Sequence, residues 1–382
     1  MRILIATDTY PPDVSGSSVF ARRLARGLVE YGHEVHVVCS SDSGPRKLVV
    51  DPDGVRVHRL PSLPLLIHPP LRFTNPVGAS RRVHGLVARI RPDVLHAQDH
   101  FTIGRAAIRA AVKSGIPVVA TNHFMPQNLT PYIPRPCRPL LAGAAWYDFQ
   151  RVYRNADRVT APTPTAAALV RRHCLSRAVE PISCGVDTDA FHPRSGPEAS
   201  RRALALPDVP TIGYVGRLDA DKRLEEPIQA LARLPVPVHF VVAGAGACRP
   251  RLEKLAADLG IAERTHFLGF VPDAILPEVY AACDVFCMPG IAELQSIATL
   301  EALATGLPVV LANAVALPHL VEQGANGFLY PPGDITALTQ ALLTLLAADR
   351  RTMCAVSRHI AERHAARRTV ARFDEIYRQL AR

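Results

Sequence analysis

The sequence predicts an α/β protein of two lobes, each a Rossmann-like, doubly wound parallel sheet, with a cleft between them. Three observations predict this class. The chain of 382 residues is long enough for two hydrophobic cores. In both halves, short apolar runs alternate with segments whose apolar residues recur at helical spacing. A stretch rich in Gly, Pro and Asp, residues 185–200, separates the two series and marks the joint.

The first series opens with an apolar run at residues 2–7, which predicts a buried strand. A Pro-rich turn follows, and from residue 17 the apolar side chains recur at the spacing of one helix face. Further strands are predicted at 33–40, 54–60, 93–97 and 116–123, and a further helix near 104–114. Strands separated by helices form parallel sheets covered on both faces, so we expect the first lobe to be doubly wound.

The second series repeats this pattern after the joint. Strands are predicted at 211–216, 237–244, 265–270, 283–289 and 307–313, and helices at 224–234, 248–260 and 296–306. We therefore expect a first lobe at residues 1–188 and a second lobe at 189–364. The basic tail at residues 365–382 is predicted to be a helix that could pack back on the first lobe. Such sheets bind ligands beyond the carboxyl ends of their strands, so we expect the functional residues to lie in the loops that follow the strands.

Charge and composition narrow the function classes. The net charge of +10 lies entirely in residues 1–190, which hold 24 Lys and Arg against 14 Asp and Glu, whereas residues 191–382 hold 20 of each. No nucleic-acid recognition motif accompanies the excess, which disfavours nucleic acid. Contact with an anionic membrane surface and a role in solubility both remain open. The start of the chain is a poor secretory signal, no apolar run reaches eighteen residues, and the eight cysteines are scattered, which favours a cytoplasmic protein.

The residues after the first strand could receive an anion. Gly16 allows close backbone approach, and the N–H groups of Ser17 and Ser18 would lie at the start of a helix. The alternative is that these serines are ordinary helix caps. The segment is not a G-x-G-x-x-G fingerprint, which disfavours a nicotinamide-dependent oxidoreductase.

A second candidate group follows the first strand of the second lobe. Arg217 and Lys222 come directly after that strand, beside Gly216, in the segment "YVGRLDADK". Two cations at a carboxyl end are well placed to neutralise a diphosphate. The alternative is that Glu225 and Glu226 pair with them.

Two carboxylates, Glu293 and Glu301, stand eight residues apart in an otherwise apolar run. No Lys or Arg occurs from residue 265 to residue 349, so no nearby cation in the sequence pairs with them. The alternative is a solvated face. Carboxylates accept hydrogen bonds from hydroxyls, and eight helical residues span about 12 Å, roughly the distance from a hexose to a ribose across a diphosphate. The N–H groups of residues 296–298, at a helix start, would face the phosphates.

At these positions the sequence resembles the retaining glycosyltransferases of family 4, which have the two-lobed GT-B fold. The resemblance covers essentially the whole chain and rests on "TDTYPPDVSG", "PDVLHAQD", "SCGVDTDAFHP", "YVGRLDADK" and "ELQSIATLEALATGLPVV". Two positions depart from the family pattern. Ser17 stands where a second glycine is frequent, and Arg223 stands where a glycine often follows the lysine.

The resemblance implies a role for each candidate residue. Glu301 would hold the donor ribose, Arg217 and Lys222 would neutralise the leaving diphosphate, and Gly16 would let the phosphate approach the first lobe. Glu293 and the loop after it would hold the donor sugar; that loop comprises Leu294, Gln295, Ser296, Ile297 and Ala298. His123, in "VVATNHF", matches a family histidine near the reacting sugar, where it would position the sugar.

The implied reaction is transfer of a hexosyl group from a nucleoside-diphosphate sugar to a hydroxyl of a lipid or small-molecule acceptor, with retained configuration. No metal and no other cofactor is implied. The "AELQS" stretch favours a UDP-sugar over GDP-mannose. A nucleotide-sugar epimerase or a phosphorylase of the same fold is the alternative. A two-lobed binding protein without catalysis is disfavoured, because it would not need Glu293 and His123 together.

Two apolar segments of the basic first lobe are candidates for membrane contact. Residues 60–71, "LPSLPLLIHPPL", and residues 135–149, "RPCRPLLAGAAWYDF", are expected to be exposed beside basic side chains. The alternative is that both pack internally and that the acceptor is a small soluble molecule.

Overall fold

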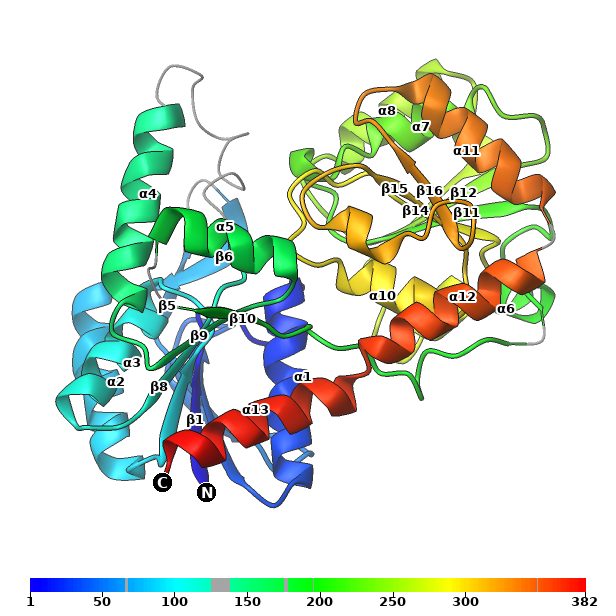
Figure 1. Ribbon diagram of the computed structural model, residues 1–382. Coiled ribbons are helices and arrows are strands. Elements are labelled where there is room, and N and C mark those ends of the chain that lie inside the picture. The colour runs from blue at the N-terminus through cyan, green and yellow to red at the C-terminus, as the bar shows by residue number, and fades with distance from the viewer. Residues whose placement is uncertain (66–67, 125–137, 175–177, 195, 349) are drawn as a thin grey trace. The chain divides into compact units, whose positions relative to one another are not determined.

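Two compact α/β units make up the chain in the computed structural model (Figure 1). One unit comprises Met1–Cys184 together with Ala366–Arg382, and the other comprises Gly185–Ala365. The structure describes residues 1–65, 68–124, 138–174, 178–194, 196–348 and 350–382. The division falls four residues before the boundary predicted from the sequence, and the C-terminal helix belongs to the first unit.

The first unit is built on an eight-stranded sheet of order β10-β9-β8-β7-β1-β2-β4-β3. Its strands are β1 (Arg2–Ala6), β2 (Glu34–Ser40), β3 (Lys47–Val50), β4 (Arg56–Leu60), β7 (Val94–Ala97), β8 (Val118–Thr121), β9 (Arg158–Ala161) and β10 (Val179–Pro181). The chain order reverses between β1 and β7, which therefore form the switch point of this sheet.

The expectation of a wholly parallel first sheet is wrong at one edge. Strand β3 runs antiparallel to β4, and all four of its residues are exposed. A tight turn connects these two strands, and a connection that short can join only antiparallel neighbours. The Pro-rich segment predicted as an exposed loop instead contributes to a separate hairpin of β5 (Ser62–Leu65) and β6 (His68–Thr74). Residues 66 and 67 of that segment lie outside the described residues.

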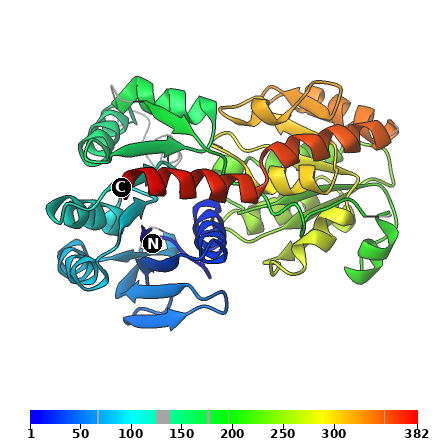
Figure 2. The same ribbon diagram turned by 60° about the horizontal axis from the view of Figure 1, so that its bottom comes forward.

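Helices pack on this sheet, and α1 and α13 lie against each other (Figure 2). The helices are α1 (Gly16–Glu30), α2 (Pro76–Ile90), α3 (Thr102–Lys113), α4 (Arg138–Tyr153), α5 (Pro164–Cys174) and α13 (Ala366–Leu380). The contact between α1 and α13 requires a glycine, because a Cβ on Gly27 would meet Val370 at 2.5 Å. Phe373 and Tyr377 of α13 are fully buried, so this helix completes the core of the first unit.

Buried histidines fix α13 to the sheet. The His96 ring on β7 bonds the Tyr377 hydroxyl through Nδ1 and the Thr121 hydroxyl through Nε2, both at 2.6 Å. His33 Nε2 lies 2.6 Å from an Asp374 oxygen. The His96 side chain is therefore enclosed and bonded on both sides in its neutral form, because one nitrogen donates while the other accepts.

We expect the free energy of unfolding to fall as the pH drops from 6.5 toward 4. Burial lowers the pKa of His96 to about 3 and that of His58 to about 4, against about 6.5 in an unfolded chain. The unfolded chain then takes up protons first, so the stability these rings contribute is complete above pH 6.5 and is lost on acidification. Urea unfolding followed by circular dichroism between pH 7.5 and 4.5 measures this. His96→Gln should be less stable at pH 7.5 but less sensitive to acid; equal pH dependence would contradict the assignment.

The second unit is a six-stranded, wholly parallel sheet of order β13-β12-β11-β14-β15-β16. Its strands are β11 (Thr211–Val215), β12 (His239–Ala243), β13 (Thr265–Gly269), β14 (Val285–Met288), β15 (Val309–Ala312) and β16 (Gly327–Tyr330). In chain order this is 3-2-1-4-5-6, the order of a doubly wound dinucleotide-type sheet. Five of these strands match the predictions, and β16 was not predicted. The strand order reverses between β11 and β14, and ligands of such sheets bind at that switch point.

The helices of the second unit cover its sheet and enclose a core of large side chains. They are α6 (Glu198–Ala203), α7 (Glu225–Leu231), α8 (Arg249–Asp258), α9 (Leu276–Ala281), α10 (Ile297–Ala304), α11 (Ile335–Ala347) and α12 (Arg350–Arg363). Tyr214, Phe240 and Phe286 on the central strands are fully buried. Within the described parts of both units, none of the helices has the length and apolarity needed to cross a bilayer.

Candidate functional site

The switch point of the second sheet brings a lysine and a glutamate together. Lys222 ends the short turn η3 (Ala220–Lys222) after β11, and Glu293 follows β14, the neighbouring strand. Lys222 Nζ lies 2.6 Å from a Glu293 oxygen and 3.0 Å from an Asp221 oxygen. The expectation that no protein cation pairs with Glu293 is therefore wrong. Its partner stands 71 residues earlier and is brought near because β11 and β14 are adjacent in the sheet.

The surroundings keep Lys222 charged. Burial opposes its charge, but the carboxylates of Glu293 and Asp221 outweigh that effect and raise the pKa of Lys222. Glu225 and Glu226 take no part: Glu225 pairs with Arg251, and Glu226 pairs with Arg223. The alternative pairing of Lys222 with those two glutamates is thus ruled out by the structure.

Arg217 occupies the loop directly after β11. Its guanidinium lies 2.7 Å from a carboxylate oxygen of the buried Asp219, and the Tyr214 hydroxyl donates to the Arg217 carbonyl at 2.8 Å. Gly216 precedes it at φ +151°, and a Cβ on Gly244 would meet the Gly216 carbonyl at 1.8 Å. The two glycines let the loops after β11 and β12 pass each other closely, which holds Arg217 at the carboxyl edge.

Glu301 lies deeper than Glu293. It is the fifth residue of α10 and is 6% exposed, and the Tyr280 hydroxyl donates to its carboxylate at 2.9 Å. The helix begins only at Ile297, so the assumption of eight continuous helical residues between the two glutamates does not hold. Glu293 therefore sits on a loop at the strand end, and Glu301 sits on the helix that follows.

The loop between these glutamates is largely enclosed. Ser296 caps α10, because its hydroxyl accepts the Thr299 N–H at 3.1 Å, whereas Ala298 is half-buried in the first turn. The predicted donor loop is otherwise buried, at Leu294, Gln295, Ser296 and Ile297. Of the N–H groups expected to face phosphates, those of Ile297 and Ala298 belong to the first turn, which has no intrahelical acceptor for them.

The start of α1 differs from the anion site that was expected around Gly16. Gly16 is the first residue of α1, with Ser15 as the cap. The Ser18 N–H donates to the Ser15 hydroxyl at 3.2 Å, and the Ser17 hydroxyl lies 3.0 Å from that of Thr9. The Ser18 N–H is therefore already bonded, and the cap of this helix is Ser15 rather than Ser17 or Ser18.

His123 follows β8 at the carboxyl edge of the first sheet. Its ring packs on Phe20 with centroids 4.7 Å apart, and its Nδ1 lies 3.9 Å from the Cys184 sulfur. Its Nε2 is buried and has no hydrogen-bond partner among the described residues. Burial lowers the pKa of His123 to about 4, so the ring is neutral at physiological pH.

Further polar side chains that the sequence analysis missed lie at this edge. Gln98 and Asn122 follow β7 and β8 and are each 1% exposed, and His100 is also buried. Both amide atoms of Gln98, Asn122 Nδ2 and His100 Nδ1 lack a hydrogen-bond partner within the part of the chain that the structure describes. A buried polar atom left unpaired costs about 1–3 kcal/mol, so such a group points to a bound ligand. The available signal was that Gln98 and Asn122 directly follow apolar strands.

Two aspartates meet at the switch point of the first sheet. The Asp8 N–H, after β1, donates to Asp99 at 2.7 Å, and the Ile103 N–H, in α3, donates to the Asp8 carboxylate at 3.0 Å. Burial, and then the neighbouring Asp99 carboxylate, raise the pKa of Asp8 well above its usual value. The described residues contain no group of three or more His, Cys, Asp and Glu side chains arranged to hold a metal ion.

Comparison with known proteins adds an independent line of evidence. Residues 14–190 match the family described as Glycosyltransferase Family 4, and residues 197–361 match Glycosyl transferases group 1. A GDP-mannose-dependent alpha-mannosyltransferase of Mycolicibacterium smegmatis is 30% identical over 354 residues, which cover 92% of this chain and 90% of that protein. Sulfoquinovosyl transferase SQD2 of Arabidopsis thaliana is 29% identical over 89% of this chain, which spans 65% of that longer protein.

The same comparison extends to solved structures. Sucrose-phosphate synthase from Thermosynechococcus elongatus matches with a TM-score of 0.83 at 22% identity, covering 99% of this chain and 98% of that one. At this identity the likeness concerns the fold, and it covers both sheets.

Proposed function

The chain belongs to glycosyltransferase family 4 and has the GT-B fold, and we propose that it moves a hexosyl group from a nucleoside-diphosphate sugar to an acceptor hydroxyl with retained configuration. The observation that carries this proposal is the Lys222–Glu293 pair at the switch point of the second sheet. The Lys222 ammonium can bind a diphosphate there, and the Glu293 carboxylate can accept hydrogen bonds from the hydroxyls of the adjoining sugar.

Donor binding is proposed to exchange the partner of Lys222. Lys222 contacts both Glu293 and Asp221. A phosphate that takes the place of Glu293 keeps the ammonium paired on both sides, whereas release of Glu293 without a replacement would weaken a buried ion pair. The freed Glu293 carboxylate then accepts hydrogen bonds from hydroxyls of the sugar. Glu301, held by Tyr280, is assigned to the ribose. These contacts set the two ends of the donor on either side of the diphosphate.

Departure of the nucleoside diphosphate is proposed to rely on protein groups. The bond between the anomeric carbon and the phosphate oxygen breaks, and the acceptor oxygen attacks the same face while its proton passes to the leaving phosphate. Arg217, Lys222 and the first-turn N–H groups of α10 stabilise the charge on that phosphate. His123, neutral at its pKa of about 4, is assigned to hydrogen bonding with the sugar rather than to charge stabilisation.

We expect turnover to be insensitive to removal of divalent metals, because Arg217 and Lys222 supply the positive charge that the leaving group needs. Initial rates with excess EDTA should stay within about twofold of rates with added Mg²⁺. A loss of tenfold or more that Mg²⁺ restores would contradict this.

The donor base has two candidates, each with its own support. The loop sequence "AELQS" (292–296) favours uridine. The GDP-mannose-dependent relative, 30% identical, favours guanosine with mannose. Melting-temperature shifts with UDP, GDP, ADP and their sugars decide between them, because the nucleotide that fits raises the melting temperature with its concentration.

The same donor panel separates transfer from the alternatives within the fold. A transferase releases free nucleoside diphosphate in proportion to the acceptor consumed. An epimerase instead converts one nucleotide-sugar into another, and a phosphorylase consumes phosphate. Absence of acceptor-dependent nucleoside diphosphate release across the panel would refute the transferase assignment.

The acceptor is proposed to be a lipid or small molecule, with the first unit touching an anionic bilayer. Two predicted contact segments are partly exposed: Leu140 is 78% and Tyr147 68% exposed on α4, and Leu63 of the β5–β6 hairpin is exposed. Trp146 and Phe149, however, are buried, so part of the segment at residues 135–149 packs inside the first unit. Its residues 135–137 lie outside the described residues.

We expect the chain to co-sediment with phosphatidylglycerol vesicles at low salt and to be released at high salt. The double variant Leu140→Ser/Tyr147→Ser should bind at least tenfold less, since each apolar side chain contributes about 1.5–3 kcal/mol on burial. Val77→Ser is the control, because Val77 is 83% exposed on α2. Equal binding of all three proteins would contradict a role for α4 in membrane contact.

A further inference from the structure

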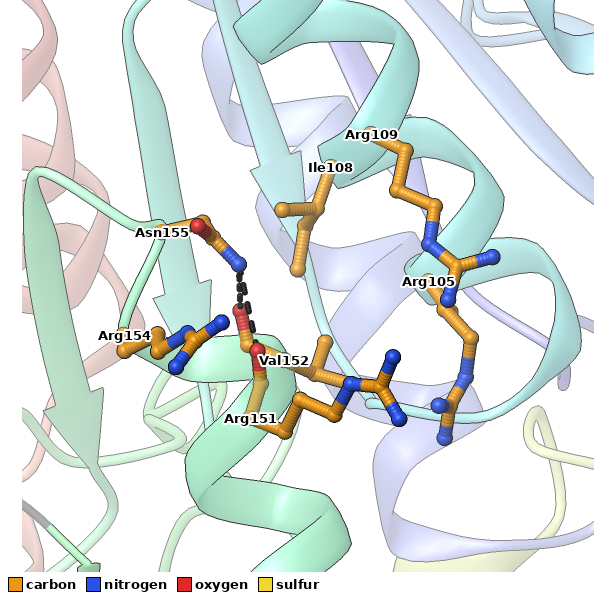
Figure 3. A pocket seen from close by; sticks show the side chains of 7 residues that line it. All are labelled: Arg105, Ile108, Arg109, Arg151, Val152, Arg154 and Asn155. Carbon is orange, nitrogen blue, oxygen red and sulfur yellow. Dashed lines mark hydrogen bonds between the residues drawn. The ribbon is translucent and has the colours of Figure 1, made fainter.

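A pocket of about 210 Å³ lies between α3 and α4 of the first unit (Figure 3). Arg105 and Arg109 project into it from α3, Arg151 comes from the last turn of α4, and Arg154 directly follows that helix. Its apolar wall is formed by the buried side chains of Ile108 and Val152. None of these residues belongs to the donor site proposed above.

The pocket carries an excess of positive charge. Arg105 is neutralised by both carboxylate oxygens of Asp148, one of them at 2.9 Å. Arg109, Arg151 and Arg154 have no ion pair with any of the residues that the structure describes. Three guanidinium groups without an ion pair therefore line one small space, and only Arg151 among them also acts, from beyond ion-pair distance, on Asp148. Like charges around this space repel one another, so binding of an anion there is favoured.

Stabilisation of helix ends does not account for the arrangement. Arg151 lies in the last turn of α4, and Arg154 directly follows that helix, where cations are favourable. Arg109, however, lies in the middle of α3, away from either end of that helix. Asn155 also donates to the carbonyls of Arg151 and Val152, so the end of α4 already has a capping side chain.

The size and chemistry of the pocket select the ligand. Its volume is below the roughly 300–1,000 Å³ of pockets that enclose drug-sized molecules. Arginine forks match the oxygens of phosphate in paired hydrogen bonds, and an apolar wall strengthens such charged contacts. We propose that the α3–α4 pocket binds the phosphate group of a second ligand, distinct from the donor. That phosphate is either a phospholipid headgroup or part of a soluble phosphorylated compound.

The test compares three proteins: wild type, the pocket variant Arg109→Gln/Arg151→Gln, and the control Arg81→Gln/Arg172→Gln. The control removes the same charge from exposed arginines of α2 and α5 in the same unit. Melting temperatures are measured against inorganic phosphate at constant ionic strength, with saturating nucleoside diphosphate to fill the donor site. Co-sedimentation with phosphatidylglycerol and with phosphatidylcholine vesicles forms the second arm.

Phosphate should raise the melting temperature of wild type and control, and the pocket variant should need at least about tenfold more phosphate for the same shift. If the variant also loses phosphatidylglycerol binding, the phosphate belongs to a headgroup; if vesicle binding is unchanged, the ligand is soluble. A pocket variant equal to wild type in both arms overturns the proposal, as does the absence of any wild-type response in both. Nucleoside diphosphate affinity should be equal in all three proteins, so a failure of the donor site would be seen separately.

Discussion

Replacing Arg217 with alanine should abolish measurable turnover and weaken binding of the nucleoside diphosphate by at least about tenfold. Hydrogen bonds to charged groups contribute about 1.5–3 kcal/mol, and loss of one donor to a developing oxyanion typically lowers kcat by about 10²–10³. The variant also leaves the buried Asp219 carboxylate, 2.7 Å from the guanidinium in this structure, beside the incoming phosphates without its arginine. Repulsion between them adds to the loss.

Lys222→Ala should have an effect at least as large, because Glu293 and Asp221 would lose the ammonium that both contact. Lys254→Ala is the matched control: this lysine of α8 is largely exposed and pairs only with Asp258 on its own helix, among the described residues. Calorimetric titration with the nucleoside diphosphate and initial-rate measurements give the two quantities. If Arg217→Ala bound the nucleoside diphosphate with wild-type affinity, the assignment of Arg217 to the diphosphate site would be wrong.

Local sequence patterns sufficed for most strands of the second unit. Apolar runs such as those at β11 and β14 have the length of buried strands and end in Gly, Pro or charged residues. Strand β3 was not predicted, because its four residues are all exposed at the edge of the sheet. A strand that buries no face leaves no hydrophobic periodicity to read.

The pairing of Glu293 with Lys222 was beyond such reasoning. The absence of Lys and Arg near Glu293 in the sequence suggested a carboxylate without a cation. Which loops meet at a carboxyl edge depends on strand order, and β11 and β14 are neighbours although β12 and β13 separate them in the chain. Gln98 and Asn122 were missed for a related reason, since only burial shows that their amides lack partners among the described residues.

Glu293 and Glu301 should affect different parts of the donor when each is replaced by glutamine. Glu301→Gln should weaken binding of the bare nucleoside diphosphate by about tenfold, because a neutral amide is a weaker acceptor for ribose hydroxyls than a carboxylate. Glu293→Gln should leave that affinity at or above the wild-type value. In this variant Lys222 loses a carboxylate that competes with the phosphate for its ammonium, at 2.6 Å in this structure.

Turnover should separate the two variants in the opposite sense. Glu293→Gln should lower kcat by about 10² or more, because its carboxylate is assigned to the sugar, whose contacts strengthen as the bond to phosphate breaks. Glu301→Gln should act mainly through KM, since the Tyr280 hydroxyl can still donate to the glutamine oxygen and hold the side chain in place. Glu263→Gln, an exposed glutamate in the turn before β13, is the control. Calorimetry with the bare nucleotide and initial rates with the full donor measure both effects, and identical losses in the two variants would show that the glutamates act on the same part of the donor.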